Sequence, residues 1–165
     1  MILTDNTEKG KEYTLSAVAR IESECFSVPW TKRAIESQIY TDGAVFALFI
    51  ADDGEAAGFV CGQTAADECE LYRIAVLPKY RGQGNAAKLM TRFIDECRSR
   101  GIKNVFLEVR QGNTAARRLY ERFSFVPVGR RKNYYSNPTE DAVVYRLSID
   151  WLDTQSSAPT GNPAF

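Results

Sequence analysis

The stretch "LPKYRGQGNAAKLM", residues 77–90, contains two glycines, several basic residues and the beginning of an amphipathic helix. Backbone amides at the N-terminus of a helix are free to bind an anion, and glycines let that anion approach the chain closely. The stretch therefore predicts a phosphate-binding loop between a strand and a helix. Three kinds of cofactor-binding fold contain such a loop, and they differ in the spacing of its glycines and of the residues that follow them.

Two nucleotide-binding alternatives can be tested directly on this loop. The phosphate loop of nucleoside triphosphatases ends in Gly-Lys-Ser or Gly-Lys-Thr. Here the second glycine is followed by Asn-Ala, so a nucleoside triphosphate site of this type is excluded. The dinucleotide fingerprint is matched from Gly82 to Ala87, with Glu108 about 20 residues further on. In that fold, however, the glycines follow the strand directly, whereas residues 77–81 intervene here. A dinucleotide-binding domain remains a less favoured alternative.

Alternating helices and strands are predicted around the loop from the period of the apolar residues. Helices are expected over 15–26, 31–39, 85–100 and 113–123, after a polar lead to which no element is assigned. Strands are expected on both sides of the Asp-Gly turn at 52–54, over 70–77 and 104–109, and on both sides of a turn at 136–139. The elements predict one domain over residues 1–151, and the Ser, Pro, Thr and Gly content of 152–165 predicts a disordered tail.

The composition excludes several classes of function. Lys plus Arg and Asp plus Glu both number 21, so the chain has no net basic charge to hold nucleic acid. No apolar run approaches the roughly 20 residues of a membrane-spanning helix, and we expect a cytoplasmic protein without a membrane partner. The chain has no histidine, and its four cysteines lack metal-site spacing, so no metal is expected. Acid and base roles must therefore fall to Glu, Asp, Tyr, Cys or Lys.

The hexapeptide Arg81-Gly82-Gln83-Gly84-Asn85-Ala86 fits the pattern Gln/Arg-x-x-Gly-x-Gly/Ala, and with it the chain resembles the GNAT family of acetyltransferases. The order of predicted elements matches that family over most of residues 15–149. The resemblance implies an α/β (α+β) fold with a central mixed, mostly antiparallel, splayed sheet flanked by helices. It also implies acetyl-CoA as co-substrate, bound by Ile74, Ala75, Val76, Arg81, Gly82, Gln83, Gly84, Asn85, Ala86, Ala87 and Asn113.

Uneven alternation of apolar and polar residues over 71–76 indicates either a bulge or a strand buried on both faces. The resemblance favours the bulge, because in the family the strand parts from its neighbour here. The free backbone groups of residues 74–76 would then bind the pantetheine arm of the cofactor as an added strand does.

Two residues are candidates for proton transfer. From the residues alone, Glu108 in "LEVR" is equally compatible with a catalytic carboxylate and with an outward-facing strand residue. Tyr120 in "ARRLYERF" lies on the apolar face of its helix and would be assigned to the core. The resemblance to the ribosomal protein alanine N-acetyltransferase branch of the family implies that Glu108 is the general base and Tyr120 the general acid.

The acceptor is predicted from two further segments, "CFSVPWTKRAIESQI" and "RRKNYYSNPTEDAVVY". By the same resemblance they form the walls of a peptide slot, with Trp30, Tyr134 and Tyr135 as substrate-binding candidates. The expected partner is a protein or peptide with a free N-terminus, and the best single substrate is the N-terminal alanine of a small-subunit ribosomal protein. A lysine or small-molecule acetyltransferase and a non-catalytic acyl-CoA-binding module remain alternatives. The sequence predicts no oligomeric state.

One position departs from the family pattern. Ser124 stands where the family usually has glycine after the helix that carries Tyr120. Glycine commonly ends a helix in the left-handed conformation, so the helix end at this position is uncertain from the sequence.

Overall fold

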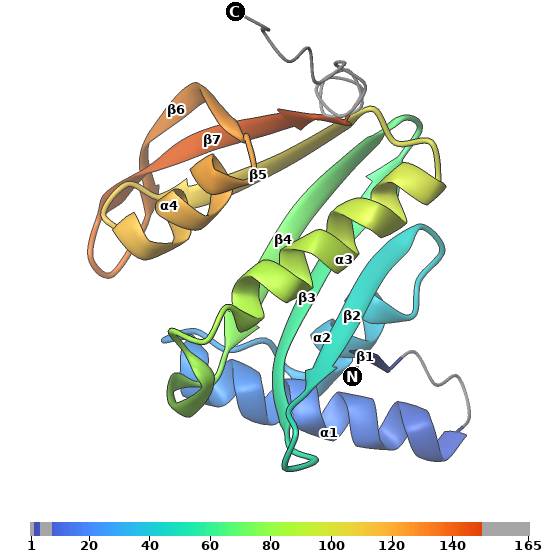
Figure 1. Ribbon diagram of the computed structural model, residues 1–165. Coiled ribbons are helices and arrows are strands. Elements are labelled where there is room, and N and C mark those ends of the chain that lie inside the picture. Colours follow the sequence, from blue (N-terminus) through green and yellow to red (C-terminus); the bar gives the residue numbers. More distant parts are fainter. Residues whose placement is uncertain (1, 4–7, 150–165) are drawn as a thin grey trace, which may run out of the picture.

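The computed structural model describes residues 2–3 and 8–149 (Figure 1). Its elements along the chain are β1 (Ile2–Leu3), α1 (Glu8–Cys25), α2 (Lys32–Ile39), β2 (Ala44–Ile50), β3 (Ala56–Ala65), β4 (Glu68–Val76), the 3-10 helix η1 (Pro78–Tyr80), α3 (Asn85–Ser99), β5 (Asn104–Arg110), α4 (Thr114–Arg122), β6 (Val126–Tyr135) and β7 (Glu140–Ser148). The tail predicted over 152–165 lies outside the described residues.

The described strands form one seven-stranded sheet in the order β1-β2-β3-β4-β5-β7-β6. Among these residues β4 and β5 are the one parallel pair, and every other pair is antiparallel. The predicted mixed, mostly antiparallel sheet is therefore confirmed. A dinucleotide-binding fold requires a mostly parallel sheet, so this alternative is not supported.

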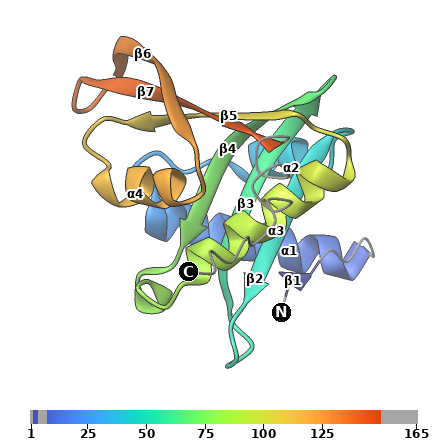
Figure 2. The same cartoon turned by 45° about the horizontal axis from the view of Figure 1, so that its top comes forward.

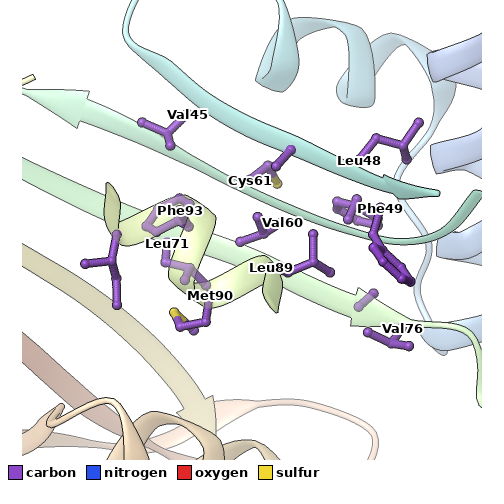
Figure 3. Close-up of a cluster of buried hydrophobic side chains, with 14 of the residues drawn as sticks. Val45, Leu48, Phe49, Val60, Cys61, Leu71, Val76, Leu89, Met90 and Phe93 are labelled. Atoms are coloured by element: carbon purple, nitrogen blue, oxygen red, sulfur yellow. The ribbon is translucent and has the colours of Figure 1, made fainter. Parts of the chain in front are cut away.

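Helices cover both faces of the sheet. In Figure 1, α3 crosses in front of β2, β3 and β4, whereas α1 and α2 lie behind them. Figure 3 shows Leu89, Met90 and Phe93 of α3 directed at the strands, where Val60 and Leu71 meet them. All five side chains are buried, and the helical spacing of the first three explains why α3 packs along this face. The packing fixes the N-terminal end of α3 beside the end of β4.

The first helix begins earlier than the sequence predicts. We expect a helix from residue 15, but α1 starts at Glu8, so the helix extends further toward the N-terminus than the sequence predicts. Most of the added turns are polar residues of good helix propensity, and they extend a helix that tertiary packing has already nucleated through Val18 and Ile21. The apolar period misses such a segment because no apolar stripe runs through it.

The predicted bulge is present in β4. Cys61 of β3 pairs with Arg73, and Gly62 pairs with Leu71, so Tyr72 is an extra residue on β4. The parallel pairing with β5 ends at the same place, at Leu71 opposite Leu107. Beyond this pair the two strands part, as Figures 1 and 2 show, and the sheet is splayed as expected.

Ser124 takes the left-handed conformation that glycine adopts readily. Its φ is +65°, its amide donates to the carbonyl of Glu121 at 3.0 Å, and the amide of Phe125 donates to Tyr120 at 3.1 Å. The end of α3 has the same pattern with Gly101, whose φ is +71°. Helix α4 therefore ends in the same way as α3, although the serine side chain disfavours the left-handed region.

We expect Ser124→Gly to stabilise the protein by roughly 0.5–1 kcal/mol, because relief of the left-handed strain outweighs the entropy that glycine adds to the unfolded chain. Urea unfolding measures this change. The matched control, Gly101→Ser, should destabilise by a similar amount, since it places a serine in the same conformation. A lower stability of Ser124→Gly would contradict this explanation of the helix end.

Candidate active site

A cleft of about 450 Å³ lies between the end of β4, the start of α3 and the first turns of α4. We call it the Arg81 cleft. Its lining includes six of the predicted cofactor-binding residues, which come from three separate parts of the chain: Ile74, Ala75, Val76, Arg81, Ala86 and Asn113. The splaying of the sheet thus brings β4 and α4 to opposite sides of one cleft.

The glycine loop leads directly into α3. Gly82 and Gly84 have φ of +74° and +77°, and a Cβ on either would meet nothing within 4 Å. Both therefore need glycine for their conformation and leave open space beside the chain. The amide of Lys88 donates to the carbonyl of Gly84 at 3.1 Å, so the earlier amides of the helix lie before its first internal hydrogen bond. The loop has the geometry of an anion site at a helix N-terminus.

The polar side chains of the loop are used within the loop itself. Gln83 Nε2 donates to the carbonyl of Lys79 at 3.2 Å, and the buried Asn85 Nδ2 donates to the carbonyl of Tyr80 at 3.0 Å. These contacts hold the turn in shape. The third predicted contact residue of this stretch, Ala87, lies in the first turn of α3.

Arg81 links the loop to β4. Its Nε donates to the carbonyl of Val76 at 2.8 Å, and its Nη2 lies 3.7 Å from the Cys25 sulfur. The guanidinium thus lies on the wall of the cleft. It forms a hydrogen bond with one of the backbone groups that are predicted to bind pantetheine. On the facing wall the Asn113 side chain accepts from the amide of Ala116 at 3.1 Å, which confirms it as the N-cap of α4.

A second cleft, of about 330 Å³, lies beside β4 and β5. We call it the Glu108 cleft, and its lining includes Gln63, Glu68, Glu70, Tyr72, Phe106, Glu108, Arg131 and Val144. Glu108 Oε1 is 2.9 Å from Arg131 Nε, and the Glu108 side chain is 16% exposed against 60% for Arg131. A hydrogen bond with Glu108 is the main reason that the pKa of Tyr134 is raised. The structure therefore brings together Glu108, Tyr134 and an arginine from β6.

Tyr120 is a residue of α4 whose side chain is buried. Its ring centroid lies 5.8 Å from that of Phe125 and 6.2 Å from that of Tyr145, and the side chain is 6% exposed. Burial, with a smaller contribution from Tyr135, raises its pKa above the ordinary value. Its neighbour Leu119 lines the Arg81 cleft. Tyr120 itself lines neither of the two clefts, and its phenol remains protonated at neutral pH.

Each of the three predicted acceptor-binding rings lies near an arginine, and for Tyr134 this is Arg131, 5.4 Å from the ring centroid. The guanidinium of Arg73 lies 4.2 Å from the centroid of the Trp30 ring, and that of Arg110 lies 4.3 Å from the Tyr135 ring. Tyr135 is half-buried, and its pKa is raised by burial and by the charge of Glu108. Tyr134 is therefore the candidate that the structure places directly against Glu108.

The interaction between Glu22 and Arg73 was not predicted from the sequence. Glu22 is fully buried in α1 and forms an ion pair with Arg73 of β4. A signal was present, since Glu22 stands among the apolar residues of its helix and a buried carboxylate requires a partner. The identity of the partner could not be read from periodicity, because the two residues are 51 positions apart.

Within residues 2–3 and 8–149 no helix is long and apolar enough to cross a bilayer. The same part of the chain holds no group of three His, Cys, Asp or Glu side chains placed to bind a metal ion. The four cysteines are free thiols.

Comparison with known proteins identifies the family to which this site belongs. The acetyltransferase (GNAT) family pattern matches residues 15–125, which span the Arg81 cleft, the glycine loop and Glu108. The chain belongs to the GNAT family. The predicted family is thereby confirmed.

The chain is also similar to individual GNAT proteins. It is 36% identical over 148 residues to the ribosomal protein bS18-alanine N-acetyltransferase of Escherichia coli K12, covering 87% of this chain and 98% of that protein. It is 36% identical over 142 residues to the protein of that name from Haemophilus ducreyi, covering 84% and 96%. The crystal structure of the E. coli ribosomal-protein-S18-alanine N-acetyltransferase superposes with a TM-score of 0.80 at 31% identity, covering 100% of this chain and 99% of that one. The GNAT fold therefore extends over the whole described chain.

We expect Gly84→Ala to weaken the binding of CoA by about 10-fold or more, because the added methyl group enters the open space beside the loop and disfavours its left-handed conformation. Isothermal titration calorimetry measures the affinity. Gly54→Ala is the matched control, since Gly54 has φ of +83° and equally open surroundings but lies in the β2–β3 turn. Equal losses of CoA affinity in both variants would contradict the assignment of the loop.

Proposed function

We propose that this protein transfers the acetyl group of acetyl-CoA to the N-terminal α-amine of a protein, and that the acceptor is the N-terminal alanine of a small-subunit ribosomal protein. The observation that carries the proposal is the pair of clefts that border one opening between β4 and β5. The names of the relatives given above support the choice of acceptor.

The Arg81 cleft is proposed to hold acetyl-CoA. The backbone amides from Gly82 to Ala87 would bind the pyrophosphate at the positive end of α3. The pantetheine arm would then run along β4 past the pair Leu71–Leu107, where the edge facing β5 has no strand partner. Arg81 would release the carbonyl of Val76 and turn toward the phosphates. This path brings the thioester to the opening of the sheet.

The Glu108 cleft is proposed to receive the amine. Three carboxylates line it, those of Glu68, Glu70 and Glu108, and they favour the approach of a protonated amine. An α-amine has a pKa of about 7.7–8.0, so a proton must leave before its nitrogen can attack. Glu108 would accept that proton, directly or through a water, while Tyr134 and Arg131 orient its carboxylate. The amine nitrogen then bonds to the thioester carbon.

The collapse of the tetrahedral intermediate breaks the carbon–sulfur bond and releases the thiolate of CoA. A thiol has a pKa near 8.5, so a proton donor assists the departure of sulfur. Tyr120 is proposed as this donor, because its burial keeps the phenol protonated and its neighbour Leu119 lines the Arg81 cleft. Trp30, Tyr134 and Tyr135 are proposed to line the path of the acceptor peptide.

The acceptor is tested with acetyl-CoA and a set of peptides that differ in their first residues, each with a free or a blocked N-terminus. We expect a gain of one acetyl group on free N-termini, most rapidly on those that begin with alanine, as measured by mass spectrometry. Blocked peptides that contain lysine are the control. Acetylation of internal lysines alone would contradict the proposal, as would turnover of small amines without turnover of peptides.

The proton-transfer roles are tested by Glu108→Gln and Tyr120→Phe. Each variant should lower kcat by roughly 10² to 10⁴ if it removes a general base or a general acid. The control for Tyr120→Phe is Tyr145→Phe, because Tyr145 is a buried tyrosine whose hydroxyl donates to Glu121 at 2.7 Å and is therefore used within the protein. The control for Glu108→Gln is Glu96→Gln on α3. Unchanged kcat in the two site variants would remove the proposed mechanism.

A further inference from the structure

Tyr80 is the last residue of η1, and its side chain is buried beside the turn that joins β2 to β3. Its hydroxyl lies 2.6 Å from Asp53 Oδ2 and 2.7 Å from Glu55 Oε2. Burial and the hydrogen bond with Asp53 raise the pKa of Tyr80 to about 12, so the phenol keeps its proton at neutral pH. The hydroxyl is therefore a donor shared between two carboxylates of one turn.

Two basic side chains balance the charge of these carboxylates. Lys79 Nζ lies 2.5 Å from Glu55 Oε2 and 3.6 Å from Asp53 Oδ2. From α1, Arg20 Nη1 bonds Glu55 Oε1, and its Nη2 donates to the carbonyl of Ala56 at 2.7 Å. We call the group of Arg20, Asp53, Glu55, Lys79 and Tyr80 the Tyr80 network. It joins α1, the β2–β3 turn and η1.

The β2–β3 turn is a firm anchor for this network. The amide of Glu55 donates to Asp53 Oδ1 at 3.1 Å, and the amide of Gly54 donates to the carbonyl of Ala51 at 3.0 Å. The amide of Ala51 donates to the carbonyl of Glu55 at 2.8 Å and closes the turn. Both carboxylates are thus held by a hairpin of the central sheet.

The backbone of η1 faces the glycine loop on its other side. Asn85 Nδ2 donates to the carbonyl of Tyr80 at 3.0 Å, and Gln83 Nε2 donates to the carbonyl of Lys79 at 3.2 Å. These two donors flank Gly84. A 3-10 helix of three residues has little stability of its own, so its position depends on its side chains. The Tyr80 network therefore attaches the loop to the sheet by a route separate from α3.

Without this attachment the loop has freedom to move. Gly82 and Gly84 are both left-handed, and glycine loses more conformational entropy on ordering than any other residue. A cavity of about 420 Å³ lies on this side of the loop and is lined by Tyr80, Gln83 and Asn85 among others. A loop that is ordered before the ligand arrives binds it more tightly than one that must be ordered on binding.

We propose that Tyr80 is a positioning residue for acetyl-CoA. Its hydroxyl, held by Asp53 and Glu55, fixes the start of the glycine loop, so the backbone amides from Gly82 to Ala87 meet the pyrophosphate without rearrangement. The inference rests on the proposed function for the identity of the ligand. Tyr80 lines neither the Arg81 cleft nor the Glu108 cleft, so it acts through the loop and not by contact.

Three variants test the network at two of its members. Tyr80→Phe removes the hydroxyl and keeps the ring. Glu55→Ala removes the carboxylate that α1 and η1 share, whereas Glu55→Gln keeps an oxygen that accepts from Tyr80 and serves as the conservative rescue.

Each disruptive variant has a matched control elsewhere in the fold. Tyr145→Phe also removes a tyrosine–carboxylate hydrogen bond of 2.7 Å, but one that joins β7 to α4. Asp67→Ala removes a turn carboxylate that pairs with Lys103 at 3.2 Å.

Isothermal titration with CoA gives the first readout. We expect Kd to rise by about 5-fold to 10-fold in Tyr80→Phe and Glu55→Ala, and to stay within about 2-fold of the wild type in Glu55→Gln and both controls. Wild-type affinity in Tyr80→Phe and Glu55→Ala would overturn the proposal. An equal loss in Tyr145→Phe would do the same, because the effect would then be general destabilisation.

Steady-state kinetics separates positioning of the cofactor from a general effect on activity. In Tyr80→Phe we expect KM for acetyl-CoA to rise in line with Kd, with kcat and KM for the peptide within about 2-fold of the wild type. A fall in kcat at unchanged KM for acetyl-CoA would contradict the role of Tyr80.

Failure of the proposed function gives a different result. A wild-type protein that binds CoA but acetylates no peptide contradicts the assigned acceptor, and the CoA affinities still test Tyr80. If the wild type binds no CoA, hydrogen exchange reads the loop directly at the amides of Arg81 and Lys88, which bond the carbonyls of Pro78 and Gly84. Faster exchange in Tyr80→Phe than in Tyr145→Phe supports the positioning of the loop, and equal exchange would overturn it.

Discussion

The arrangement of the molecule depends on the end of the hydrogen-bond ladder between β4 and β5. The pairing stops at Leu71 and Leu107, at the bulge made by Tyr72. Unpaired backbone groups inside a sheet are unfavourable unless they find other partners. Part of this demand is met within the chain, since Arg81 and Cys25 both donate to the carbonyl of Val76. The remaining edge of β4 is available to a ligand.

The elements around this opening are fixed by contacts that lie outside it. Leu89, Met90 and Phe93 hold α3 against the sheet, so the start of the helix cannot move away from β4. The short helix η1 is held from the other side, where the Tyr80 hydroxyl lies within hydrogen-bond distance of two carboxylates, 2.6 Å from Asp53 and 2.7 Å from Glu55. Lys79 joins the same carboxylates, and hydrogen bonds from Lys79, Arg20 and Tyr80 lower the pKa of Glu55 to about 2. The glycine loop is therefore supported at both ends.

The sequence predicts those parts of the structure that depend on local pattern. The amphipathic period gives α3, the glycine spacing gives the loop, and the resemblance to GNAT proteins selects Glu108 and Tyr120. What it misses depends on contacts between distant residues. The inward side chain of Asn85 and the stacking of Trp30 on Arg73 follow from the way that separate segments meet. The polar first turns of α1 are missed for the opposite reason, since they carry no apolar stripe.

In the proposed mechanism acetyl-CoA enters the opening between β4 and β5 and uses the free edge of β4. Titration of the isotope-labelled protein with acetyl-CoA, followed by amide chemical shifts in NMR, tests it most directly. The largest shifts should fall on Ile74 to Val76 and on Gly82 to Ala87, with smaller changes on β2 and β7. Shifts confined to other parts of the sheet, or shifts of the glycine loop without any of β4, would contradict the account.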